Sequence, residues 1–517
     1  MAMCKECNQN SYEYKWCKPC NLKHFQNDFN NWTSGNGKID KFIQDAQLNA
    51  NKHYDVIEWI LFDRFKDVKQ IGKGGFGTIH YARWIDGRIW NWDIENQQWK
   101  RQRNWDQVGE VEVALKKFDN FVNFNDVLNE MKIHFKTNNI LVGEVEVALK
   151  KFDNFVNFND VLNEMKIHFK TNNILGSIRF YGITQDPETH SYMMVLEYTK
   201  DGNLREYLKI NFNNINWKQK LYNLYYLSLM LMRIHKLDIV HQDFHPGNIL
   251  SLNFKNDIKI SDFGLSKLIG ANPNNPEKKN IVGVLPYIAP EVLSGDEEYT
   301  KAADVYSFGI IAYEMVTGFH PYPDIPHNKD LAMKICNGLR PKISFHIPKL
   351  ITRMIMRCWD ARVTHRPTFE ELKDELWKYY IDYYDYLNEG ENKDSEIVIQ
   401  IKKAEEFSAN QNHSRGTEEF SANQNHSRAS IWKNISRIFH WRKESTNKTD
   451  SEIATPTPLN YQTHPQAIYT SRLLNFSKLP KPKNEENFEK ELEELTKSTS
   501  VSSAVASKLY VPDFNIF

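Results

Sequence analysis

Long apolar runs are absent from this 517-residue chain. Nowhere do about 18 apolar residues follow one another, the length that a membrane-spanning helix needs. The first ten residues, MAMCKECNQN, also lack the hydrophobic core of a secretory signal. We therefore expect no transmembrane segment and a cytoplasmic location. An excess of charge is absent too, because 66 Lys and Arg residues balance 66 Asp and Glu residues, which gives no indication of nucleic-acid binding.

Cysteine is scarce, and six residues in the whole chain exclude a disulfide framework. Four of the six nevertheless lie within the first twenty residues: Cys4, Cys7, Cys17 and Cys20. Two Cys-x2-Cys units are typical of knuckles that wrap a tetrahedral Zn²⁺, although the spacer between them is shorter than in zinc ribbons. We expect a structural zinc site that binds a partner protein, with His24 as an alternative ligand. The competing interpretation is a metal-free or redox-active segment.

Composition divides the chain into four segments. Residues 1–35 are polar and contain the cysteines, and residues 36–64 carry apolar side chains at helical spacing, which predicts a helical lead-in. Residues 65–380 contain the motifs described below and should form the main domain. Residues 381–517 are rich in Asn, Ser, Lys and Glu, so we expect them to be mostly disordered.

An internal repeat lies inside the third segment. The 34-residue sequence VGEVEVALKKFDNFVNFNDVLNEMKIHFKTNNIL occupies residues 108–141 and recurs without a change at 142–175. Two copies are too few for a solenoid. We interpret the repeat as an in-frame duplication, and we expect a compact domain to have room for only one copy.

A glycine-rich stretch, GKGGFGTI, occupies residues 72–79. Glycines in a hairpin let backbone N–H groups approach the phosphates of a nucleotide, because no side chain intervenes. A dinucleotide-binding turn would require a helix here, whereas the following TIHYARW is typical of a strand. The residues expected to surround a nucleotide are three glycines and two flanking isoleucines: Gly72, Gly74, Gly77, Ile71 and Ile79.

Three further motifs follow in order: HQDFHPGN at 241–248, DFG at 262–264 and APE at 289–291. Together with the glycine-rich stretch and the VALK tetrapeptide of the repeat, they resemble the protein kinase signature set. The later CW and RP pairs make residues 65–380 similar to tyrosine-kinase-like Ser/Thr kinases. The resemblance implies an α+β, bilobal protein kinase fold, with a small antiparallel β-sheet lobe containing one main helix and a large, mostly helical lobe.

The resemblance also implies roles for individual residues. Asp243 would be the catalytic base, and Asn248 and Asp262 would hold Mg²⁺, since carboxylate and amide oxygens suit a hard cation. The residues implied at the adenine are a gatekeeper and two that offer backbone groups: Leu196, Glu197 and Thr199.

The VALK lysine would hold the ATP phosphates and pair with a helix glutamate, and the repeat offers two candidates for each position. We favour Lys150 with Glu164, because this pairing places the surplus residues in a tryptophan-rich connection between the second and third strands, where insertions are tolerated. The alternatives are Lys116 with Glu130, and a mixed pair of Lys116 with Glu164.

Gln242 departs from the resemblance, because many kinases have an arginine there that binds a phosphorylated activation segment. Neutral glutamine cannot do so strongly. Between Asp262 and Glu291 the only hydroxyl residues are Ser266 and Tyr287. We therefore expect activity without phosphorylation of this segment.

His245 is the second departure, since Ser/Thr kinases usually place a lysine there against the γ-phosphate, and neutral imidazole is a weaker phosphate partner. The expectation is a protein kinase that uses ATP and Mg²⁺ to phosphorylate Ser/Thr hydroxyls of protein substrates. A pseudokinase-type scaffold acting through the zinc segment and the tail is the alternative. It is disfavoured because Asp243, Asn248, Asp262 and a VALK lysine are all present.

Overall fold

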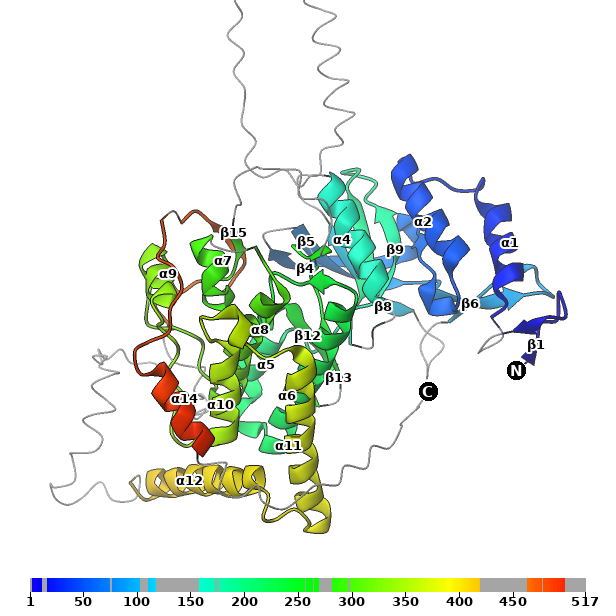
Figure 1. Ribbon diagram of the computed structural model, residues 1–517. Helices are drawn as coiled ribbons and strands as arrows, with labels where there is room; N and C mark the ends of the chain where they lie inside the picture. Colours follow the sequence, from blue (N-terminus) through cyan, green and yellow to red (C-terminus); the bar gives the residue numbers. More distant parts are fainter. Residues whose placement is uncertain are drawn as a thin grey trace, which may run out of the picture.

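The computed structural model describes residues 2–11, 16–74, 77–102, 110–117, 158–172, 174, 176–255, 257–263, 265–268, 281–295, 298–418, 463–476 and 478–497. They form a small lobe built on a β-sheet and a large helical lobe (Figure 1). This arrangement confirms the α+β, bilobal kinase fold expected from the sequence. None of the described helices is both long enough and apolar enough to cross a membrane.

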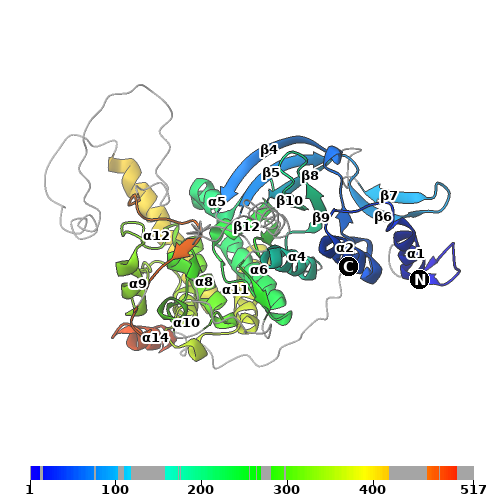
Figure 2. The same cartoon turned by 90° about the horizontal axis from the view of Figure 1, so that it is seen from above.

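The small lobe is organised by a six-stranded sheet. Its strands, in spatial order, are β3 (Glu58–Trp59), β9 (Phe180–Gln185), β10 (Tyr192–Glu197), β8 (Val111–Lys117), β5 (Gly77–Trp84) and β4 (Phe65–Gly74). All neighbours are antiparallel except β3, which runs parallel to β9. Helices α2 (Gly37–Asn49) and α4 (Phe158–Thr171) cover one side of the sheet (Figure 2). Along β8, Ala114 packs against the cluster that includes residues of these helices, whereas Val113 and Leu115 belong to a separate cluster with strand residues such as Ala82.

The small lobe takes its central strand from the first copy of the repeat and its helix from the second. Strand β8 lies within residues 108–141, whereas α4 lies within 142–175. This is the mixed alternative rather than the favoured use of the second copy alone. Residues 118–157, which include Glu130 and Lys150, lie outside the described part of the chain.

An N-terminal unit packs beside the small lobe. It consists of β1 (Ala2–Met3), β2 (Asn10–Ser11), α1 (Lys18–Asp28) and the hairpin of β6 (Arg88–Asp93) and β7 (Gln98–Gln102). The hairpin of β6 and β7 comes from the tryptophan-rich insert. Its Trp99 stacks on Phe25 and on Trp16, which joins the hairpin to this unit. The helical lead-in predicted for residues 36–64 contains α2, whose Ile39 and Ile43 are buried.

The large lobe surrounds helix α8, which is buried along nearly its whole length. Its helices are α5 (Leu204–Asn211), α6 (Trp217–Lys236), α7 (Pro290–Ser294), α8 (Lys301–Thr317), α9 (Lys329–Cys336), α10 (Lys349–Cys358) and α11 (Phe369–Glu389). The large lobe also contains two short antiparallel pairs: β11 (Ile239–Val240) with β14 (Lys267–Leu268), and β12 (Ile249–Asn253) with β13 (Asp257–Ile260). Thr368 and Glu371 form a capping box that begins α11.

The C-terminal part differs from the mostly disordered segment expected over residues 381–517. Helix α12 (Glu396–Glu418) buries Ile397, Val398 and Ile401. Strand β16 (Arg472–Leu474) pairs with β15 (Ile281–Gly283), and helix α14 (Phe488–Lys497) lies beside α10 (Figure 1). The expectation is wrong for these elements because a few well-spaced apolar residues dock them on the large lobe despite the polar composition.

Arg366 and Glu291 form a buried ion pair in the large lobe. Two guanidinium nitrogens of Arg366 each lie 2.7 Å from a Glu291 carboxylate oxygen, and its Nε donates to the Asp360 carbonyl at 2.8 Å. Both residues are at least 94% buried, with exposures of 6% and 2%. Since neither charge can reach water, each depends on the other.

Replacement of Glu291 by Ala should therefore lower the free energy of unfolding by about 3–5 kcal/mol, because it leaves a buried cation without its anion. Glu370→Ala is the control, since that carboxylate is exposed and its partner Lys236 lies 3.6 Å away. The control should cost less than about 1 kcal/mol. Urea unfolding followed by circular dichroism measures both. Similar losses in the two variants would contradict the assignment.

Lys220 should make stability depend on pH. Burial lowers the pKa of its ammonium group from 10.5 to about 7, although Nζ donates to the Val316 carbonyl at 3.2 Å. Between pH 7 and pH 10 the unfolded chain holds this proton and the folded chain does not. Stability should therefore rise with pH, by about 1.4 kcal/mol per unit from this group. In Lys220→Met this contribution to the slope should vanish, and an equal slope in both proteins would overturn the prediction.

Candidate functional site

Lys116 is the centre of the site. Strand β8 lies between β5 and β10, which places Lys116 opposite Ile79 and Met194. Its Nζ lies 2.6 Å from Oε1 of Glu164 in α4 and 2.8 Å from Oδ1 of Asp262 in the large lobe. Burial tends to lower the pKa of Lys116, but the charges of Asp262 and Glu164 raise it above its ordinary value. The ammonium group therefore stays charged across the neutral pH range.

The expected pair of Lys150 and Glu164 is not the pair that the structure forms. Glu164 is 3% exposed and binds Lys116, which is 4% exposed. Lys150 lies outside the described residues. The local sequence does not separate the two lysines, because the copies are identical, and the expected position of the surplus residues favoured Lys150.

Asp304 holds the loop that carries Asp243. One Asp304 carboxylate oxygen accepts the backbone N–H of His241 at 2.9 Å, and the other accepts that of Gln242 at 3.1 Å. His235 Nε2 lies 2.8 Å from the same carboxylate, which is fully buried. Gln242 has a φ of +68°, a conformation that costs an ordinary residue free energy and therefore needs such support.

Asp243, His245 and Asn248 are arranged by short contacts within the loop. Asn248 donates from Nδ2 to the Asp243 backbone carbonyl at 2.9 Å. The His245 ring accepts the Gly247 N–H at Nδ1, at 3.0 Å. Since Nδ1 is an acceptor, the ring carries its proton on Nε2. His245, the residue expected to approach a phosphate, is therefore held against its own loop.

A cavity of about 410 Å³ lies between the lobes. It is lined by residues of both lobes and by one segment of the tail, including Gly77, Ile79, Lys116, Asn248, Asp262 and Ser471. The structure thus brings together the phosphate-side residues predicted from the sequence. Asn248 and Asp262 offer the oxygen ligands that suit Mg²⁺, and Lys116 offers a cation for phosphates.

Other predicted residues lie around this cavity rather than in its lining. Ile71 is 47% exposed on β4, and Leu196 is buried in the small-lobe core. The Glu197 N–H donates to the Arg179 carbonyl at 2.9 Å, and the Thr199 carbonyl accepts the Gly202 N–H. In the glycine-rich hairpin, Gly72 pairs with Ile79 and Gly74 with Gly77.

The hydroxyl groups of the activation segment are both buried. Ser266 is 1% exposed and donates from Oγ to the His241 carbonyl at 2.9 Å. The Tyr287 hydroxyl donates to Glu314 at 2.5 Å, and burial raises the pKa of this phenol well above its usual value. Neither hydroxyl is presented to solvent.

Ser471 is a site residue that sequence reasoning missed. Its Oγ donates to Oδ2 of Asp243 at 2.5 Å and lies 3.2 Å from Nε2 of His245. It immediately precedes β16, in a segment whose polar composition suggested disorder. The sequence signal that was available is the RLL that follows it, because Leu474 is buried against the large lobe.

The four N-terminal cysteines form a second cluster. Their sulfur atoms all lie within 4.8 Å of one another, with Cys4 and Cys20 3.8 Å apart and Cys7 and Cys17 3.6 Å apart. Zn–S bonds of about 2.3 Å in a tetrahedron place sulfur atoms roughly 3.8 Å apart, so the cluster fits zinc. His24 instead contacts Glu6 at 2.9 Å and stacks on Trp92.

Comparison with known proteins agrees with this geometry. Residues 136–376 match the family model for protein tyrosine and serine/threonine kinases. The chain is 31% identical over 209 residues to the tyrosine-protein kinase SPK-1 of Girardia tigrina. It is 33% identical over 206 residues to a probable serine/threonine-protein kinase of Dictyostelium discoideum, and 32% identical over 217 residues to a protein kinase and PP2C-like domain-containing protein of Arabidopsis thaliana.

These matches cover 38%, 38% and 36% of this chain, and 41%, 12% and 33% of the three relatives. The likeness therefore concerns one domain and not whole proteins. The matched range contains Asn248 and Asp262, which line the cavity between the two lobes, and Asp243, whose backbone carbonyl accepts a hydrogen bond from Asn248. Residues 136–376, and the bilobal fold that contains them, belong to the eukaryotic protein kinase superfamily.

Proposed function

We propose that this protein transfers the γ-phosphoryl group of ATP to serine or threonine hydroxyls of proteins. The observation that carries the proposal is the meeting of Lys116, Asp262 and Asn248 in one cavity that Ser471 also lines. The hydroxyl of Ser471, the residue immediately before the paired strand β16, reaches the Asp243 carboxylate. A tyrosine hydroxyl lies a whole ring farther from its backbone, so the observed spacing favours aliphatic acceptors.

Each residue then has a defined task. Lys116, kept charged by Glu164, would orient the phosphates, and Asp243 would accept the proton of the attacking hydroxyl. Asn248 and Asp262 would hold Mg²⁺, which supplies positive charge to the transferring phosphoryl group. Positioning and electrostatic stabilisation contribute most of the rate enhancement in this chemistry.

Lys116→Met should reduce kcat/KM on a generic substrate such as casein by about 100-fold or more, because it removes the preorganised cation. Asp243→Asn should have at least as large an effect. Lys150→Met is the matched control, since it changes the same residue type in the same local sequence, and should stay within about two-fold of wild type.

Loss of activity in Lys150→Met with retention in Lys116→Met would show that the second copy forms the site. A wild-type protein that binds ATP in a fluorescence assay but phosphorylates nothing would favour the scaffold alternative. Comparison of unfolding midpoints establishes that each variant is folded.

We further propose that Cys4, Cys7, Cys17 and Cys20 hold one structural Zn²⁺. The support is the sulfur spacing and the burial of Cys4, Cys17 and Cys20 beside α1. Such a site would brace the N-terminal unit, and we propose that this unit binds a partner protein.

Elemental analysis of the purified chain should therefore find about one zinc per molecule. Cys7→Ser should lose the metal and lower the melting temperature, because metal binding contributes to folding. Cys336→Ala, which alters a buried cysteine of the large lobe, should retain the zinc. A zinc-free wild type that melts at the same temperature with and without chelator would contradict the site.

A further inference from the structure

The chain's own tail lines the cavity between the lobes, next to Asp243. Strand β16 pairs antiparallel with β15, with Arg472 opposite Gly283 and Leu474 opposite Ile281. Strand β15 belongs to the activation segment between Asp262 and Glu291. Main-chain pairing of this kind is how an extended peptide is held at a sheet edge. Ser471, the residue before β16, is thereby placed over Asp243.

We propose that Ser471 is an autophosphorylation site and that the phosphoryl group is transferred within one molecule. This inference rests on the proposed kinase function and adds a substrate to it. The segment 463–476 would act as a tethered substrate, bound before any other protein.

The hydrogen bonds around Ser471 direct its hydroxyl proton toward Asp243, as the reaction requires. His245 carries its proton on Nε2, because Nδ1 accepts the Gly247 N–H. Nε2 therefore donates to Ser471 Oγ at 3.2 Å, and Ser471 donates its own proton to Asp243 Oδ2 at 2.5 Å. A general base must lie within hydrogen-bond reach of the proton that it removes, and Asp243 does.

The donor side of the reaction also faces Ser471. Ser471 lines the same cavity as Lys116 and Asp262. The cavity that Ser471 shares with the cation expected to orient the phosphates has a volume of about 410 Å³, and we expect the triphosphate to bind in it. Acceptor and donor would enter one cavity from opposite sides, as in-line transfer requires.

Tyr469 fixes the tail on the N-terminal side of Ser471. Its hydroxyl donates to the Pro321 carbonyl at 3.0 Å, and its backbone carbonyl accepts from the Arg205 guanidinium at 2.7 Å. Its ring packs against His320 and His327, with centroids 4.9 and 4.8 Å away. On the other side of Ser471, Leu474 is 4% exposed in the large-lobe core. The serine is held from both directions.

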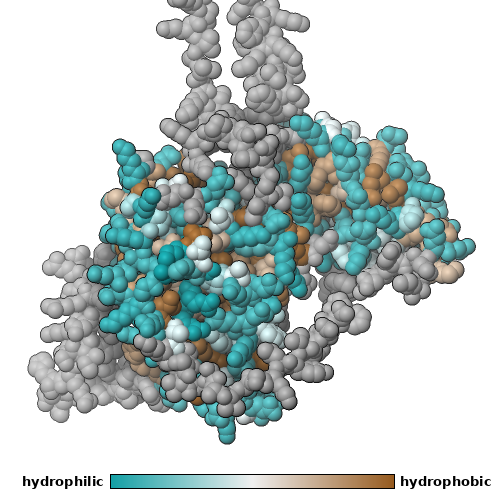
Figure 3. Space-filling model, in the orientation of Figure 1, coloured by the Kyte–Doolittle hydropathy of each residue, from teal (hydrophilic) through white to brown (hydrophobic). Residues whose placement is uncertain are grey.

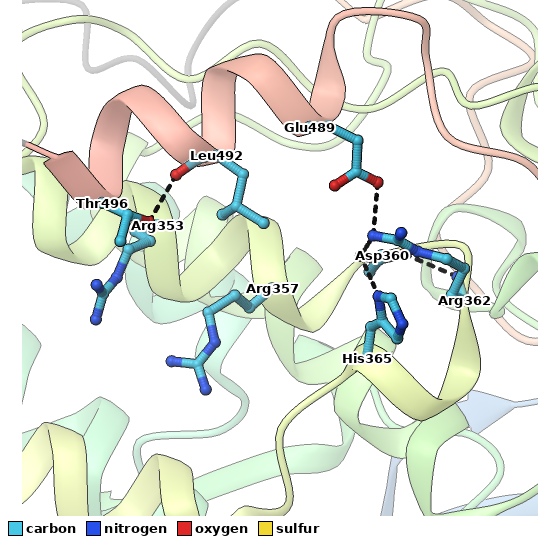
Figure 4. Close-up of a pocket in the computed structure, with 8 residues that line it drawn as sticks. All are labelled: Arg353, Arg357, Asp360, Arg362, His365, Glu489, Leu492 and Thr496. Carbon is cyan, nitrogen blue, oxygen red and sulfur yellow. Dashed lines mark hydrogen bonds and ion pairs between the residues drawn. The ribbon is translucent and has the colours of Figure 1, made fainter.

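Helix α14 anchors the same tail farther along the large lobe. Glu489 lies 2.6 Å from Arg362, and Figure 4 shows this contact beside Leu492 and Thr496 over the arginines of α10. Asn484 donates to Asp360 at 2.8 Å and accepts the Ala361 N–H at 2.7 Å. A tether of this kind raises the effective concentration of Ser471 at its own site.

The reaction balances with Mg-ATP as the phosphoryl donor. Ser471 Oγ forms a bond to the γ-phosphorus, and the bond from that phosphorus to the β–γ bridging oxygen breaks. The electron pair of the broken bond leaves with ADP, and the serine proton passes to Asp243. The products are phosphoserine and ADP.

The test incubates phosphatase-treated, full-length protein with Mg-ATP and locates phosphate by mass spectrometry. Phosphate should appear on Ser471 with a rate constant that does not change when the protein concentration varies 20-fold. Ser471→Ala should lose this phosphate, Ser471→Thr should carry it on the threonine, and Thr470→Ala should still carry it on Ser471. Casein phosphorylation, measured in parallel, reports the general kinase activity.

The outcomes separate the two proposals. An unmodified Ser471 in a protein that phosphorylates casein overturns the autophosphorylation site and leaves the proposed function standing. A rate that rises in proportion to protein concentration overturns transfer within one molecule. Absence of phosphate on both substrates, with ATP binding retained, overturns the kinase function together with this inference.

Discussion

The buried ammonium group of Lys116 is the constraint on which the cleft depends. It is withdrawn from water by three strands, and removing a charge from water costs several kcal/mol unless close partners offset the loss. Those partners come from different parts of the chain, because Glu164 belongs to α4 and Asp262 to the large lobe. The same three groups therefore set the position of the helix, the closeness of the lobes and the charge facing the cavity.

The large lobe holds its part of this arrangement through buried polar contacts. Asp304 fixes the backbone that carries Asp243, and the pair of Arg366 and Glu291 fixes the end of the activation segment. Gln242 is neutral, and the hydroxyls of Ser266 and Tyr287 are already bonded inside the lobe. The surface of this lobe is mainly hydrophilic in the view of Figure 3, which agrees with a fold whose apolar residues are mostly buried in its interior.

Site residues that belong to short motifs could be predicted from the sequence, whereas contacts between distant parts of the chain could not. Asp243, Asn248 and Asp262 could be found because their spacing is local and chemically specific. Lys116 could not be preferred over Lys150, since the local sequences of the two lysines are identical and the tolerance of the surface connection for insertions favoured the second copy. The docking of β16 and α14 was hidden for another reason: Leu474 and Phe488 each supply a deep contact in a stretch whose average composition is polar. Composition gives the average polarity of a segment, but docking of the segment depends on a few apolar residues.

Because β8 comes from the first copy of the repeat and α4 from the second, the architecture of the cleft does not depend on the number of copies. Strand β8 lies near the start of the duplicated region and helix α4 lies near its end. The residues that the duplication adds therefore lie between these two elements. Because the copies are identical, loss of any 34 consecutive residues within the repeated region gives one and the same sequence. In that shorter chain the ATP lysine and its glutamate would stand as far apart in sequence as Lys150 and Glu164 do now. Recombination could therefore expand or contract this gene segment in frame without replacing either member of the ion pair.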